Sequence, residues 1–279
     1  PIYEEKNKIY VKKGLCFFEG ESSTTFVPKK IIASSTSAHD KFPFQRGVYN
    51  SNYEETGRYR YFGTKEHRGL QSTTTLLDRV INSLFKASID SKDKLLKLNH
   101  VFSFLGYSPR LTVSYHFDTS PKRFLAYFNK ENEHNHLDKH PRIRHALNKI
   151  ENDNILASEV IEAYEQLDDF SMGKREIIFD VDFNNGNFKV GSLNMFTHTH
   201  LLRSLGLMRL SDISLYSDQS GKEIVSIREA SSGEQSIIAT ILGIASEIEN
   251  DSLICIDEPE ISLHPEWQEK FIDLLMETF

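Results

Sequence analysis

The sequence predicts an α/β protein with a mixed β-sheet, flanking helices and an inserted, mainly helical lobe. Short apolar runs at residues 29–34 and 252–257 are typical of buried strands. Between Ser236 and Glu247, apolar residues recur at the spacing of a helix with one packed face. Strand and helix patterns in this order indicate an α/β architecture.

Further strand and helix patterns fill the rest of the chain. Strands are expected over residues 58–62, 111–117, 176–183, 207–217 and 222–227. Helices are expected over residues 72–85, 92–105, 192–205 and much of 120–170. We therefore divide the chain into residues 1–69 and 176–279, which form a head, and residues 70–175, which form the helical insertion.

Composition and charge narrow the class of protein. The 279 residues are enough for one large or two modest domains, and the absence of any long apolar run predicts no transmembrane helix. A net charge of −7 gives no bulk attraction to nucleic acid. Contact with DNA would need a local basic patch, for which Arg58 and Arg60 with their neighbouring tyrosines are a candidate, although a solvated face fits them too. Only two cysteines occur, which fits a reducing cytoplasm.

Both ends of the chain suggest a fragment. Residue 1 is Pro, and the last residue, Phe279, falls inside an amphipathic helix expected from Pro265 onward. We expect further sequence before and after these residues.

Two interpretations fit the stretch Ser232-Gly-Glu-Gln235, which opens the helix expected at residues 236–247. A Ser at the N-cap with Gln three residues later is a capping box. The same geometry suits a phosphate, because a helix N-terminus presents free N–H groups and the positive end of its dipole. The Ser232 hydroxyl would add a donor, and Gly233 would let the backbone approach closely.

The strand at residues 252–257 ends in Asp257, and Glu258 follows it. Such a pair is common before a helix, because carboxylates favour the preceding turn. Phosphoryl transfer needs one carboxylate to hold a hydrated Mg²⁺ and a second to orient or deprotonate the attacking water. Asp257 and Glu258 offer both, and Pro259 ends the strand.

Three motifs carry a family resemblance. Ser231-Ser-Gly-Glu-Gln235 resembles the signature loop of ABC-type ATPases, and Leu253-Ile-Cys-Ile-Asp-Glu258 resembles their Walker B strand. Ile261-Ser-Leu-His-Pro265 stands where that class has its D-loop, in the form seen in soluble AAA family ATPases of the RecF and overcoming-lysogenisation-defect groups. The motifs occur in the right order, with 21 residues between Gln235 and Asp257.

This resemblance implies ATP and Mg²⁺ as cofactors and a head-to-head dimer. The signature loop of one head would contact the γ-phosphate held by the other. Asp257 would support Mg²⁺, and Glu258 would be the catalytic residue that polarises water. His264 would lie near the dimer interface, although its place before a Pro at helix position N1 also gives it an ordinary structural explanation. The nucleotide-binding residues would be Ser231, Ser232, Gly233, Glu234, Gln235 and His264.

A second resemblance narrows the group. Residues 28–42 and 59–63 resemble a segment of the ATPase subunits of Septu-type and retron-associated anti-phage systems. That resemblance implies an HNH-type nuclease partner, and in some systems a reverse transcriptase with its RNA–DNA product. The alternatives are the ATPase part of an overcoming-lysogenisation-defect-type nuclease, a RecF-like DNA-repair or chromosome-maintenance ATPase, and a non-hydrolysing scaffold.

The chain departs from the ABC pattern at three points. The P-loop pattern Gly-x-x-x-x-Gly-Lys-Ser/Thr is absent, and we expect it before residue 1. The switch histidine is expected beyond the helix that follows Pro265, and no Gln follows Ser34 closely enough to serve as the Q-loop. We therefore expect ATP hydrolysis to need a P-loop that is not present in this chain.

Overall fold

The computed structural model describes most of the chain. The described residues are 2–5, 8–11, 28–37, 39–43, 58–64, 73–90, 96, 98–129, 137, 141–184, 187–189, 193–217, 224–259, 263 and 265–279. Two short strands near the N-terminus, β1 (Ile2–Glu5) and β2 (Lys8–Val11), pair as an antiparallel hairpin.

A three-stranded parallel sheet carries the acidic strand end. Its order is β10-β3-β4, with β3 at Lys30–Ser35, β4 at Tyr59–Gly63 and β10 at Ser252–Asp257. The register places Asp257 beside Ser35, and Ser35 beside Gly63. The carboxyl ends of all three strands therefore meet at one edge, which is where ligands bind in open α/β sheets.

The second sheet is antiparallel and five-stranded, in the order β7-β6-β5-β8-β9. Its strands are β5 (Tyr107–Phe117), β6 (Glu176–Asp182), β7 (Asn187–Lys189), β8 (Met208–Ser217) and β9 (Ile224–Ser226). Buried and more exposed residues alternate along β6, so the sheet has one core face and one outer face. Strand β5, from the predicted insertion, pairs with β6 and β8 from residues 176–279.

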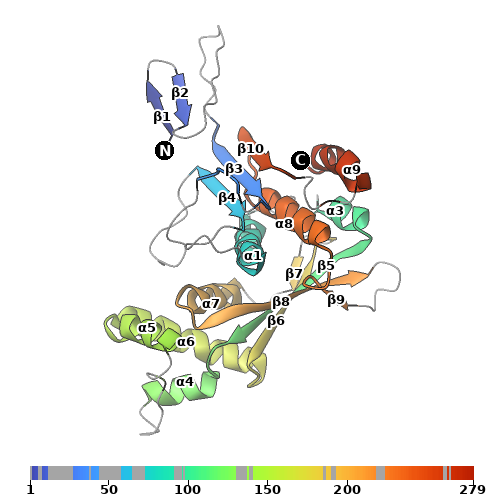
Figure 1. Cartoon of the computed structure of the whole chain (residues 1–279). Coiled ribbons are helices and arrows are strands. Elements are labelled where there is room, and N and C mark those ends of the chain that lie inside the picture. Colours follow the sequence, from blue (N-terminus) through green and yellow to red (C-terminus); the bar gives the residue numbers. More distant parts are fainter. Residues whose placement is uncertain are drawn as a thin grey trace.

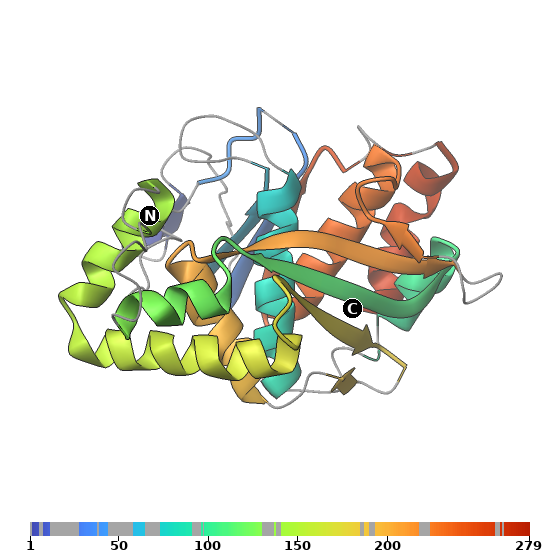
Figure 2. The ribbon, with the colours of Figure 1, turned by 90° about the horizontal axis from the view of Figure 1, so that it is seen from below.

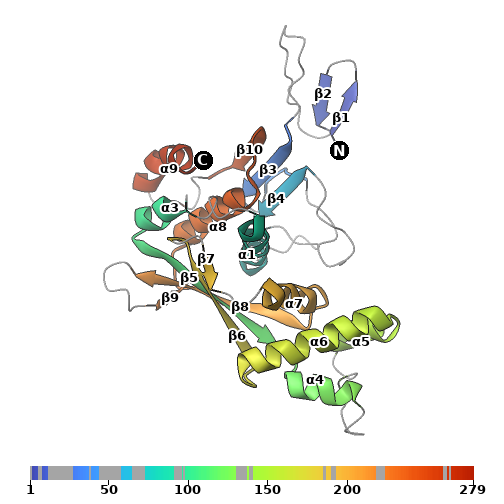
Figure 3. The ribbon, with the colours of Figure 1, turned by 180° about the vertical axis from the view of Figure 1, so that it is seen from behind.

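The helices surround and separate the two sheets. They are α1 (Thr73–Asp90), α3 (Asn99–Phe104), α4 (Pro121–Phe128), α5 (Pro141–Glu151), α6 (Asn154–Ser171), α7 (Leu193–Ser204), α8 (Ser232–Glu247) and α9 (Pro265–Thr278). Figures 1 to 3 show α1 and α8 between the sheets, with α4, α5 and α6 at one end of the five-stranded sheet. No helix in the described part of the chain is both long enough and apolar enough to span a bilayer.

Helix α8 is buried on all sides, which corrects the prediction of a single packed face. Every residue from Ser236 to Glu247 is buried. Its partners are α1 and the three-stranded sheet, and Gly243 lets the Phe62 ring of β4 come so close that a Cβ would lie 2.8 Å from it. A helix that is apolar or small all round is typical of a core position.

One continuous hydrophobic cluster joins both sheets. It runs from Ile32 and Phe62, through α1 and α8, to the core face of the five-stranded sheet. Phe85 of α1 lies edge-on to Phe179 of β6 and stacks on Phe196 of α7. A buried Arg203 from α7 adds a polar link, because it bonds Asp78 and Asn82 of α1.

The predicted α/β fold, with mixed sheets and flanking helices, is confirmed. Strands β3 and β10 lie within one residue of their predicted ranges. Of the helix predicted at residues 92–105, the structure describes α3 at Asn99–Phe104, while residues 91–95 and 97 lie outside the described residues.

Candidate functional site

The N-terminus of α8 points past the edge of the sheet that carries Asp257. Glu247, near the end of α8, lies 2.6 Å from Lys30 at the start of β3, whereas Thr240 lies 3.1 Å from Ser34 near the end of β3. Helix α8 therefore runs antiparallel to β3. From Thr240 back to Ser231 the helix advances about 13 Å, at 1.5 Å per residue. Residues 231–235 thus project beyond the sheet.

The first turn of α8 is closed by a capping box. Ser231 is the N-cap, its Oγ accepts from the Glu234 N–H at 3.2 Å, and Glu234 Oε2 accepts from the Ser231 N–H at 2.7 Å. The predicted box paired Ser232 with Gln235, so the observed one begins a residue earlier. Gln235 instead donates from Nε2 to the Ala230 carbonyl at 3.0 Å. The residues expected to form a loop before the helix are therefore its first turn.

Two backbone donors of this turn are left over. The capping box uses the N–H of Glu234, and the N–H of Gln235 bonds the Ser231 carbonyl at 3.0 Å. Within the described residues, the N–H groups of Ser232 and Gly233 make no hydrogen bond. They lie at the positive end of the helix dipole, which suits an anion.

The Glu234 carboxylate is held from two sides. Its Oε1 accepts a 2.8 Å hydrogen bond from the hydroxyl of Tyr107, the first residue of β5. Burial alone would raise the pKa of Glu234, but the hydrogen bonds from Ser231 and Tyr107 outweigh burial and lower the pKa. Glu234 is therefore ionised at neutral pH. Sequence reasoning missed Tyr107, since no local pattern connects it to α8.

The acidic pair lies at the carboxyl end of β10. Asp257 is half-buried and is the last residue of the strand, whereas Glu258 is exposed. Glu258 has a φ of 50°, in the left-handed region, and it precedes Pro259, where extended backbone is preferred. Backbone strain of this kind concentrates at functional sites.

A third carboxylate lies in the loop that follows β3. Asp40 is buried, and its Oδ2 accepts a 2.8 Å hydrogen bond from the Tyr61 hydroxyl, while Oδ1 accepts from the Phe42 N–H at 2.9 Å. The Tyr61 hydroxyl lies over Gly63 at the end of β4, where a Cβ would come within 2.0 Å of it. Asp40 was not predicted as a site residue, because one Asp in a polar loop carries no signal of burial.

The donors that remain fit a phosphate and a hydrated cation. Ser232 and Gly233 offer N–H groups to phosphate oxygens. Asp257 offers one carboxylate, which suits Mg²⁺ because that ion keeps most of its water ligands. No group of three or more His, Cys, Asp or Glu side chains suited to a metal occurs among the described residues. His264 lies outside the described residues.

A family profile described as "AAA domain, putative AbiEii toxin, Type IV TA system" matches residues 18–278. The chain belongs to this AAA family. The match spans both sheets and covers α8, β10 and the acidic pair. No curated protein and no solved structure matched the chain.

Membership assigns the chain to the AAA and ABC-type ATPases, a class that hydrolyses nucleotides and in general uses ATP and Mg²⁺. The α/β architecture fits the head of such an ATPase. In this AAA family chain, the N–H groups of α8 that suit a phosphate lie beyond the sheet edge that carries the carboxylates of β10. The two sets of groups are therefore separated along the axis of α8.

Proposed function

We propose that this AAA family chain is the ATP-binding and hydrolysing subunit of a cytoplasmic anti-phage complex that controls an HNH-type partner nuclease through ATP-dependent head dimerisation. The observation that carries the ATPase part is the placement of two half-sites. The N-terminus of α8 projects about 13 Å beyond Ser34, at 1.5 Å per residue, while Asp257 and Glu258 stay at the sheet edge. A composite site between two heads needs half-sites that face different partners.

Each residue then has a role set by its chemistry. The N–H groups of Ser232 and Gly233 bind the γ-phosphate of a nucleotide held by the other head. Asp257 would hold Mg²⁺, and the ion would supply charge neutralisation on the phosphates. Glu258 accepts a hydrogen bond from the attacking water and orients it. His264 is assigned to the head-to-head interface.

The defence role is supported by the resemblance of residues 28–42 and 59–63. These residues form β3, the loop that carries the buried Asp40, and β4. The segment therefore borders the same sheet edge as Asp257, through the pairing of Ser35 with Asp257. A segment that resembles defence ATPases at that edge suits an ATPase whose bound nucleotide is recognised by a partner protein.

The first test is Glu258→Gln in the full-length protein. We expect ATP hydrolysis to fall by about 10² to 10⁴, the usual contribution of a general base, while ATP binding and ATP-induced dimers persist. Phosphate release, nucleotide binding and size-exclusion chromatography measure these three properties. Phage plating on cells that express the variant should show lost protection.

A matched control is Glu266→Gln, which alters an exposed Glu paired with Lys270 on α9. This variant should hydrolyse ATP normally. Hydrolysis at the normal rate in Glu258→Gln would show that Glu258 is not the base. Full protection without any co-purifying nuclease would remove the defence partner from the proposal while leaving the ATPase intact.

A further inference from the structure

A tyrosine from the five-stranded sheet reaches the first turn of α8. The Tyr107 hydroxyl donates a 2.8 Å hydrogen bond to Glu234 Oε1, and Glu234 Oε2 accepts the Ser231 N–H at 2.7 Å. Both oxygens of the carboxylate are thus held. The two bonded residues are 127 positions apart in the chain. This bond ties the antiparallel sheet to the turn that presents Ser232 and Gly233.

The position of Tyr107 is itself fixed by its surroundings. Gly106, with a φ of 77°, turns the chain into β5, and Tyr107 pairs with Ser217 of β8. Its ring packs against the hydrophobic cluster. Burial, and then the hydrogen bond to Glu234, raise the pKa of Tyr107 to about 12, so the hydroxyl keeps its proton and stays a donor at neutral pH.

The charge of Glu234 makes its placement matter for a bound anion. An ionised carboxylate in the first turn is attracted to the free N–H groups there and repels a phosphate. Without Tyr107, the carboxylate would be held through Oε2 by the Ser231 N–H alone, and its free Oε1 would compete with a phosphate for the neighbouring N–H groups of Ser232 and Gly233. While it is held, these two donors stay available.

We propose that Tyr107 is a positioning residue that holds Glu234 away from the phosphate-binding N–H groups of Ser232 and Gly233. This inference rests on the proposed ATPase function of α8. It also makes the five-stranded sheet a part of the composite site, because a shift of β5 relative to α8 would break the Tyr107–Glu234 bond and leave the carboxylate held by the Ser231 N–H alone.

The test is Tyr107→Phe in the full-length protein, with steady-state ATP hydrolysis as the readout. We expect kcat to fall about 10-fold, the loss typical of one hydrogen bond to a charged group. The KM for ATP should stay within about twofold of the wild-type value. The reason is that the first turn of α8 contacts only the γ-phosphate of a nucleotide held by the other head.

The chain offers a closely matched control. The Tyr127 hydroxyl donates a 3.0 Å hydrogen bond to Glu151, so Tyr127→Phe removes the same kind of bond within the helical lobe. Tyr127→Phe should keep normal kcat and KM. Equal kcat in Tyr107→Phe and Tyr127→Phe would overturn the proposal.

Two further readouts separate positioning from general stability. Hydrogen exchange of the amides at residues 231–235 should be faster in Tyr107→Phe than in Tyr127→Phe. In a Glu234→Ala background, Tyr107→Phe should have no additional effect on kcat, and additive losses would contradict the inference. A wild-type protein without ATPase activity would reject the proposed function, whereas unchanged exchange in Tyr107→Phe would reject the role of Tyr107 on its own.

Discussion

Gly243 lies in the second half of α8, against the Phe62 ring of β4. In an exposed helix, Gly→Ala stabilises by about 1 kcal/mol through helix propensity. At Gly243, however, the new Cβ would lie 2.8 Å from Cγ of the buried Phe62 ring, and overpacking of this kind costs about 1–3 kcal/mol. We therefore expect Gly243→Ala to destabilise the protein by about 1 kcal/mol, as measured by urea unfolding.

The sign of this effect depends on the ring of Phe62. The crowding atoms are Cγ, Cδ1 and Cδ2 of Phe62, and a Phe62→Ala background removes all three, so Gly243→Ala should then be neutral or stabilising. A destabilisation of equal size in both backgrounds would show that the close approach of Phe62 is not its cause.

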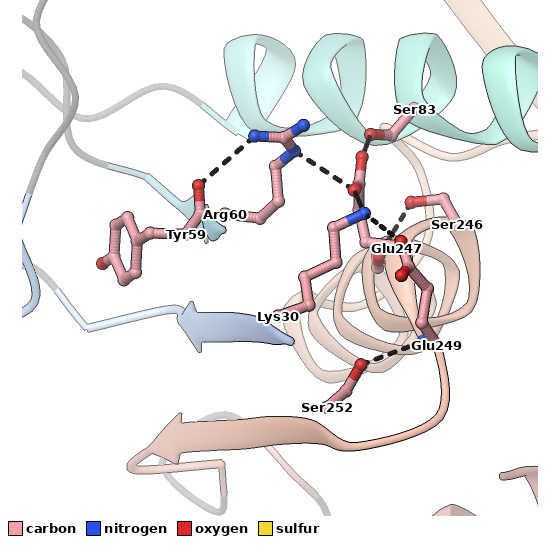
Figure 4. Close-up of polar contacts among 9 residues, drawn as sticks. Lys30, Tyr59, Arg60, Ser83, Ser246, Glu247, Glu249 and Ser252 are labelled. Atoms are coloured by element: carbon pink, nitrogen blue, oxygen red, sulfur yellow. Dashed lines mark hydrogen bonds and ion pairs between the residues drawn. The ribbon is translucent and has the colours of Figure 1, made fainter. Parts of the chain in front are cut away.

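At the scale of elements, the end of α8 is fixed by the buried Glu247 and two half-buried cations. Glu247 Oε2 pairs with Lys30 of β3 at 2.6 Å and with Arg60 of β4 at 3.1 Å, and Oε1 accepts from the Ser83 hydroxyl of α1 (Figure 4). Four elements meet at this one carboxylate. Removing its charge takes the Glu247 ion pair from Arg60 and leaves Lys30 paired with Glu249 alone, at 3.0 Å. Because both cations are only half-buried, Glu247→Gln should cost about 2 kcal/mol of unfolding free energy.

The contribution of Glu247 depends on pH with a defined sign. Burial would raise its pKa, but the bonds from Lys30 and Ser83 and the charge of Arg60 outweigh burial and lower the pKa below 4.5. A lowered pKa in the folded state means that the stabilisation is present above 4.5 and is lost as the pH falls through the folded-state value. The difference between wild type and Glu247→Gln should therefore shrink in acid.

Urea unfolding at neutral pH and well below pH 4.5 measures this difference. The exposed pair of Glu266 with Lys270 supplies the control, because Glu266→Gln should change stability by less than about 1 kcal/mol. A gap between wild type and Glu247→Gln that stayed constant with pH would contradict the assignment.

The elements differ in how far the sequence predicts them. Strands β3 and β10 are predicted well because their apolar residues are continuous in the sequence, as in Ile31–Ala33 and Leu253–Ile256. Helix α8 starts four residues before the predicted range at Ser236, since its capping turn is polar and shows no apolar period. Strand β5 begins at Tyr107 rather than Leu111, because its first residues, which include Pro109, do not alternate.

The candidate site likewise contains residues that the sequence predicts and contacts that it does not predict. Asp257, Glu258 and the signature residues are local motifs, and local motifs can be read from a chain. The bond between Tyr107 and Glu234, and the bond between Asp40 and Tyr61, depend on how separate elements pack. No periodicity or spacing encodes those contacts, so only the fold brings them together.

At the scale of the whole molecule, the two sheets share one core rather than forming separate ones. The hydrophobic cluster runs through α1 and α8 into both sheets. Arg203 of α7 adds a buried link, because its guanidinium bonds Asp78 of α1 and lies 5.0 Å from the centroid of the Tyr115 ring in β5. A shared core favours cooperative unfolding.

We therefore expect a single unfolding transition. Trp267, the only tryptophan, lies in α9 with its ring 6.3 Å from Phe104 of α3, so its fluorescence reports the head, while far-UV circular dichroism reports all helices, including α4–α6. The two signals should change at the same temperature. Arg203→Met, which removes the ion pair from the half-buried Asp78, should lower both midpoints together. Loss of helical signal before the Trp267 transition would show that α4–α6 unfold independently and that the packing of α6 against α7 and β6 does not couple them to the rest of the chain.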